Sequence, residues 1–81
     1  MKLKMKLKKA ETGNDFYQHH FDDMCEMLER GEGIWLYCWC TGHTRCAMVE
    51  ASYEKALHKK YGERLVRVKD EDGWLEGFAL S

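Results

Sequence analysis

The feature that most constrains the fold is an uninterrupted apolar segment near the middle of the chain. Residues Ile34 to Cys40 are rich in aromatic and β-branched side chains and number seven, which is a typical strand length. A segment that is apolar on both sides is typical of a strand inside a sheet. It therefore predicts a central strand.

The beginning of the chain shows a different pattern. From Met1 to Lys9, apolar residues alternate with lysines, so that Leu3, Met5 and Leu7 point one way and the lysines point the other. This alternation predicts a strand with one dry face and one solvated face.

Two helices and a hairpin are predicted around these strands. Apolar residues at helical spacing indicate each helix, and a glycine is expected to end each one. The predicted elements are, in chain order, a helix at 14–30 ended by Gly31, a helix ended by Gly62, and hairpin strands at 64–69 and 74–80 around the acidic turn 70–73.

The order strand, helix, strand, helix, strand, strand favours an α+β class, a two-layer α/β sandwich. Crossover connections between parallel strands are right-handed, so both helices should lie on one face of a small mixed sheet. The chain has 81 residues, 44% of them hydrophobic, and no internal repeat or low-complexity tract. We expect a single domain spanning residues 1–81.

Composition argues against several classes of function. The formal net charge of −1 gives no field that would attract nucleic acid or an anionic membrane. No apolar segment approaches the roughly 20 residues of a membrane span. Three of the four cysteines lie within one nine-residue segment instead of being spread as a secreted disulfide framework would require. We therefore expect a reducing, cytoplasmic setting.

The sheet face away from the helices is a candidate interaction face. If the dry side of the first strand lies under the helices, its lysines occupy the other face, which the central strand must also line. That strand contributes either its odd-numbered aromatic residues or the set Ile34, Leu36, Cys38 and Cys40. The aromatic set fits better, because lysine stems and cation–π contacts can shield large rings. With Phe78 as a further aromatic from the last strand, the predicted face contains Lys4, Lys6, Trp35, Tyr37, Trp39 and Trp74.

This face has three interpretations. The aromatic residues belong to the core, or they form an exposed patch that binds a protein partner or a second copy of the chain. A lysine-rich aromatic sheet can also stack the bases of single-stranded nucleic acid, which the absence of a net basic charge makes the weaker alternative.

The segment after the central strand is the most unusual part of the chain chemically. Cys38, Cys40, His43 and Cys46 supply three thiolates and an imidazole, which is the ligand set of a structural zinc site. Their spacing is tighter than the usual Cys-x2–4-Cys pairs. In a second interpretation Cys40 or Cys46 is a reactive thiolate, since Arg45 adds positive charge and Cys46 opens a helix.

Residues 37–47 distantly resemble the active-site loop of rhodanese sulfurtransferases; Cys-dependent phosphatases have a similar loop, but the four residues between Cys40 and Arg45 exclude their five-residue spacing. Those loops place a nucleophilic Cys after a strand in an anion-binding loop closed by Arg; Gly42 lies one position earlier than the rhodanese glycine. Residues 36–46 more closely resemble uncharacterised bacterial and phage domains with a strand Cys-Trp-Cys, a turn, and a Cys-His pair that opens a helix. Ala47 replaces that His here.

In a third interpretation Cys38 and Cys46 are small buried apolar residues and the turn has no chemical role. The chain contains no complete catalytic set and no phosphate-binding glycine loop. We therefore predict a non-enzymatic protein-interaction module without a cofactor, for instance a small phage or mobile-element inhibitor of a host complex such as an anti-CRISPR protein. A thiol enzyme and a zinc-binding protein are the alternatives.

Overall fold

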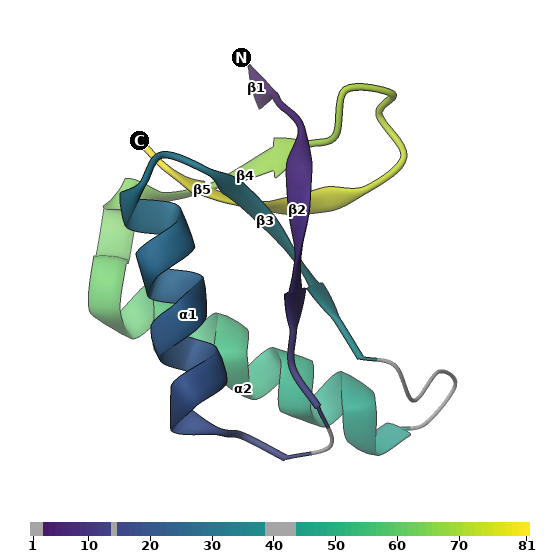
Figure 1. Ribbon diagram of the computed structural model, residues 1–81, viewed down its shortest axis with the longest axis vertical. Coiled ribbons are helices and arrows are strands. Elements are labelled where there is room, and N and C mark those ends of the chain that lie inside the picture. Colours follow the sequence, from purple (N-terminus) through teal and green to yellow (C-terminus); the bar gives the residue numbers. More distant parts are fainter. Residues whose placement is uncertain (1–2, 14, 39–43) are drawn as a thin grey trace.

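The computed structural model describes residues 3–13, 15–38 and 44–81 (Figure 1). The predicted class is confirmed: two helices cover one face of a mixed sheet. The elements are β1 (Leu3–Lys4), β2 (Leu7–Glu11), α1 (Gln18–Glu29), β3 (Gly33–Tyr37), α2 (Thr44–Tyr61), a 3-10 turn η1 (Gly62–Arg64), β4 (Leu65–Lys69) and β5 (Glu76–Leu80).

The predicted first strand is two strands, and they lie at opposite edges of the sheet. The strand order is β1-β4-β5-β3-β2, with β1 parallel to β4, β2 parallel to β3, and β5 antiparallel to both of its neighbours. Four spacings of about 4.8 Å separate the edges of a flat sheet, whereas the three residue steps from Lys4 to Leu7 reach only about 11 Å. The sheet must therefore curl until the N-terminal segment bridges its two edges.

The larger core lies between the sheet and the helices. Met24 and Leu28 of α1 and Tyr53 and Leu57 of α2 are almost completely buried there. The strands contribute every second side chain to this core, as a pleated sheet requires. The buried strand residues that belong to it are Ala10, Ile34, Leu65 and Phe78.

A second, smaller core lies on the face without helices. Leu7, Val68 and Ala79 are buried together, with Met5 and Trp35 among the residues packed against them. The prediction that the side of the first strand carrying Leu7 lies under the helices is therefore wrong. The curl of the sheet makes its other face concave, so Leu7 is buried and Met5 is partly buried inside that curve.

The ends of the helices follow their local chemistry. Gly31 and Gly62 adopt positive φ directly after the helices, which confirms both predicted stops. The first helix begins at Gln18, later than predicted, because the hydroxyl of Tyr53 binds the chain just before it. The last strand begins at Glu76 and leaves Trp74 in the turn.

Candidate protein-interaction site

The predicted aromatic residues of β3 lie on the face away from the helices, as expected. Trp35 packs against the smaller core, and the rings of Trp35 and Tyr37 meet edge to face with centroids 5.4 Å apart. Both side chains are half-buried. Trp39, the third member of the row, lies outside the described residues.

The structure does not bring the other predicted residues to this pair. Trp74 is 86% exposed in the turn between β4 and β5. Phe78 is buried under the helices, so the expectation that it joins the open face is wrong. Lys4 pairs with Lys69 in the ladder at the opposite edge of the sheet, and Lys6 is exposed in the bend between the strands.

The lysine that does accompany the aromatic pair is Lys9, which the sequence analysis missed. Its Nζ lies 4.5 Å from the centre of the Tyr37 ring. The signal was present in the sequence, because Lys9 is the first lysine at an odd-numbered position of the alternating segment. The two-residue period of a strand therefore places Lys9 on the side that carries Leu7.

The outer edge of β2 carries backbone groups that point away from the sheet. The N–H of Thr12 donates to the carbonyl of Tyr37 over 2.9 Å, which directs Thr12 and Ala10 towards β3. Since backbone groups alternate along a strand, those of Lys9 and Glu11 point outward. Within the described ranges, no strand lies on that side of β2.

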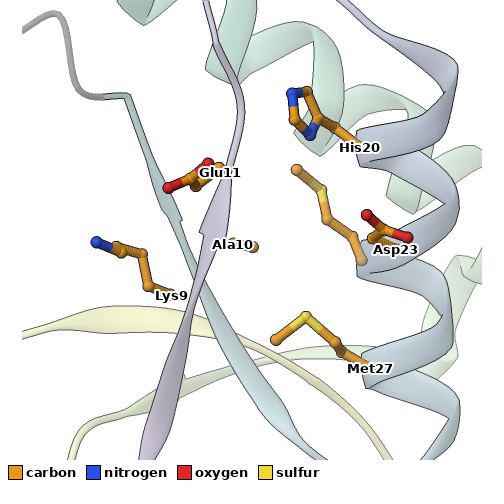
Figure 2. A pocket seen from close by; sticks show the side chains of 7 residues that line it. Lys9, Ala10, Glu11, His20, Asp23 and Met27 are labelled. Carbon is orange, nitrogen blue, oxygen red and sulfur yellow. The ribbon is translucent and has the colours of Figure 1, made fainter.

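A groove separates this edge from α1 (Figure 2). A cavity of about 230 Å³ lies between Lys9, Ala10 and Glu11 on the strand and four residues of the helix. In Figure 2, Ala10 points towards α1, whereas Lys9 and Glu11 point to the other side of β2. The helix residues are two methionines and two polar side chains: Met24, Met27, His20 and Asp23.

Tyr53 fixes the position of α1 relative to this edge. Its hydroxyl accepts the N–H of Tyr17 over 2.8 Å and donates towards the carbonyl of Thr12 at 3.1 Å. The ring stacks on Phe16, with centroids 4.6 Å apart. One buried hydroxyl thus joins the end of β2 to the start of α1, and its burial raises the pKa of Tyr53.

An ion-pair cluster joins β2 to the chain that follows α1. Lys8 Nζ lies 2.7 Å from a carboxylate oxygen of Glu32, and Arg30 binds the second oxygen at 3.1 Å. The hydrogen bond from Lys8, helped by Arg30 and opposed by partial desolvation, lowers the pKa of Glu32. These contacts tie β2 to the connection between α1 and β3.

The cysteine segment is only partly described. Cys38 and Cys46 are both buried, and their Sγ atoms lie 2.9 Å apart. Cys40 and His43, the remaining predicted zinc ligands, lie outside the described residues, as does the side chain of Arg45. Within the part of the chain that is described, no group of three or more His, Cys, Asp or Glu side chains is arranged to hold a metal ion.

Comparison with known protein families, with curated proteins and with solved structures finds no match. The resemblances of residues 36–46 therefore stay predictions. Among the described residues, neither helix is both long and apolar enough to cross a membrane.

Proposed function

We propose that the chain is a non-enzymatic protein-interaction module that binds an extended segment of a partner protein along the outer edge of β2. The observation that carries the proposal is the outward-pointing backbone of Lys9 and Glu11 beside the groove that α1 forms with this strand. An added strand satisfies such edge groups with main-chain hydrogen bonds.

Both sides of an added strand would meet side chains suited to recognition. One row of its residues would enter the groove against Met27, whose flexible thioether adapts to apolar side chains of different shape. The alternate row would lie beside Lys9 and Tyr37 on the other face. The preferred segment is therefore apolar at every second position.

Charged residues on the edge favour selective binding over general aggregation. Lys8, Lys9 and Glu11 follow one another closely along β2, and charges on an edge strand oppose indiscriminate pairing. A second copy of the chain is the competing occupant of the edge. Inhibition of a host complex, as by a phage protein, is a narrower form of the proposal and stays a prediction.

The proposal is tested by removing one outward-pointing N–H. Lys9→Pro deletes this donor without deleting a bond to β3, and proline is tolerated at such edge positions. The control Lys9→Ala removes the same side chain and keeps the N–H. With a heptapeptide selected from a random display library as the probe, we expect at least a tenfold weaker Kd for Lys9→Pro than for Lys9→Ala.

Circular dichroism and sedimentation show whether a weaker Kd reflects unfolding or a changed oligomeric state instead of the lost N–H. Both variants should keep the wild-type circular dichroism and sediment as the wild type does. Equal peptide affinity of the two folded variants would rule out strand addition at this edge. A wild-type dimer that Lys9→Pro alone dissociates would instead assign the edge to a second copy.

A further inference from the structure

Two cysteines meet where the central strand gives way to the second helix. Cys38 directly follows β3, and Cys46 lies in the first turn of α2. Their sulfur atoms are 2.9 Å apart, although they are not joined by a disulfide. Each of the two residues is 7% exposed, so the pair is largely shielded from solvent.

The two thiols occupy different positions in the fold. Cys38 Sγ lies 2.9 Å from Cys46 Sγ and 3.3 Å from the carbonyl oxygen of Gly13. Cys46 lies in the first turn of α2, where exposed backbone N–H groups stabilise negative charge on a sulfur atom. Cys46 is thus the better placed of the two to act as the nucleophile, and Cys38 is held beside it.

We propose that Cys38 and Cys46 form a modification site that a small disulfide, such as oxidised glutathione, converts into an intramolecular disulfide. The Cys46 thiolate attacks one sulfur of the reagent, whose S–S bond breaks and releases one glutathione thiolate. Cys38 then loses its proton and attacks Cys46 Sγ, which releases the second glutathione. Two thiols are oxidised, the reagent takes up both electrons, and the two protons end on the two glutathione thiols.

The geometry favours this step because little movement is needed. The sulfur atoms approach from 2.9 Å to the roughly 2.05 Å of a disulfide bond. The new bond closes a short loop between β3 and α2 and so restricts the unfolded chain. For a domain of this size we expect the Tm to rise by about 10 °C on oxidation.

The experiment uses the full chain with Cys40→Ser, which leaves three cysteines. After incubation with oxidised glutathione and alkylation, intact mass should show one alkylated thiol, that of Cys25. Trypsin should then release peptides 31–45 and 46–55 as one linked species. In the same Cys40→Ser background, adding Cys25→Ala should leave this link unchanged, whereas adding Cys46→Ser should abolish both the link and the rise in Tm.

The wild-type chain provides the same information if Cys40→Ser does not fold. Chymotrypsin can cut after Trp39, which separates Cys38 from Cys40 before the linked peptides are weighed. Three alkylated thiols in the oxidised Cys40→Ser protein, a link through Cys25 or Cys40, or stoichiometric zinc that blocks oxidation would each overturn the proposal. Peptide binding at β2 is measured separately, so it can fail or succeed independently.

Discussion

The two faces of the sheet are both apolar, but different physical arrangements keep them dry. The face under the helices is covered by side chains from both α1 and α2, with residues such as Tyr53 and Leu57 at 0% exposure. In the described part of the chain no helix lies over the opposite face, and its buried apolar cluster of Leu7, Val68 and Ala79 is covered by the curl of the sheet itself. A sheet face can therefore be dry without a second layer when one strand bends across it.

The two arrangements place different demands on the sequence. The helix-covered core needs side-chain volume, because packing between layers fills its space. The curled face needs close approach of backbones, and it has glycines where strands come together. A Cβ built on Gly33 would lie 2.8 Å from atoms of both Met5 and Leu7, and one on Gly77 would collide with the carbonyl oxygen of Ile34.

The largest effect should come from Gly77→Ala. Backbone atoms of β3 cannot yield as a flexible side chain can, so we expect a loss of more than about 4 kcal/mol in unfolding free energy, measured by urea titration. Gly31→Ala is the matched control, since it has open space but a φ of 87°, and should cost about 1–2 kcal/mol. Equal losses would mean that the curl does not depend on this contact.

A smaller difference should separate leucines from the two cores. Leu57→Ala opens a cavity in the fully buried core and should cost about 3–4 kcal/mol, whereas Leu7→Ala at the rim of the curl should cost about 2 kcal/mol. Chemical denaturation of both variants measures the ratio. If Leu7→Ala costs more than Leu57→Ala, the curled face is the main source of stability.

Tyr53→Phe tests how far the helix-covered core depends on one polar atom. Without the hydroxyl, the N–H of Tyr17 loses a partner and the carbonyl of Thr12 loses its donor, so we expect a loss of about 1–3 kcal/mol. Faster amide exchange at Tyr17 should accompany it. Unchanged exchange there would show that the hydroxyl does not hold the start of α1.

The pH dependence of stability should depend on Tyr53 and on the partly buried Tyr61. Burial raises the pKa of Tyr53, and burial together with hydrogen bonds to Cys25 and Glu29 raises that of Tyr61, so the folded state holds both protons more tightly. Their stabilisation is complete below pH 10 and is lost as the pH rises above it. Urea titrations between pH 8 and 11 should show a shallower decline for Tyr53→Phe and Tyr61→Phe than for wild type; parallel profiles would contradict this.

The smallest loss of stability is expected for Lys9, which lies at the exposed margin of the curled face. Lys9→Ala removes the ammonium group above Tyr37, a partly solvated contact worth about 0.5 kcal/mol. Thermal unfolding should shift by only a few degrees. A loss comparable to that of Leu7→Ala would show that Lys9 covers the core rather than its margin.

Much of the fold follows from local sequence patterns. The expectation that lysine stems shield large rings placed Trp35 and Tyr37 on the face away from the helices, and the glycines marked both helix ends. The sheet face on which Leu7 lies could not be predicted in this way. Alternation divides the side chains of a strand between two faces, but it does not say which face the helices cover. Phe78 was misassigned for the same reason.

The candidate site was less predictable than the fold. The outer edge of β2 becomes an edge only through the strand order, which depends on the contact of β5 with β3. The contact between Cys38 and Cys46 also depends on how α2 returns beneath the strand it follows. The strand patterns indicated an aromatic sheet face, but they gave no sign of a strand edge whose backbone groups point outward.

The bent N-terminal segment also bears on how the chain folds during synthesis. The N–H of Leu7 donates to the side chain of Asp70, 63 residues later, and β1 pairs with β4. The N-terminal segment is synthesised first, but its contacts with β4 and Asp70 can form only after the C-terminal hairpin has been synthesised. Contacts of such long sequence separation slow folding. A ribosome-bound chain that lacks β4 and β5 would expose Met5 and Leu7. We therefore expect chaperones to bind a nascent chain of that length more strongly than the full-length chain.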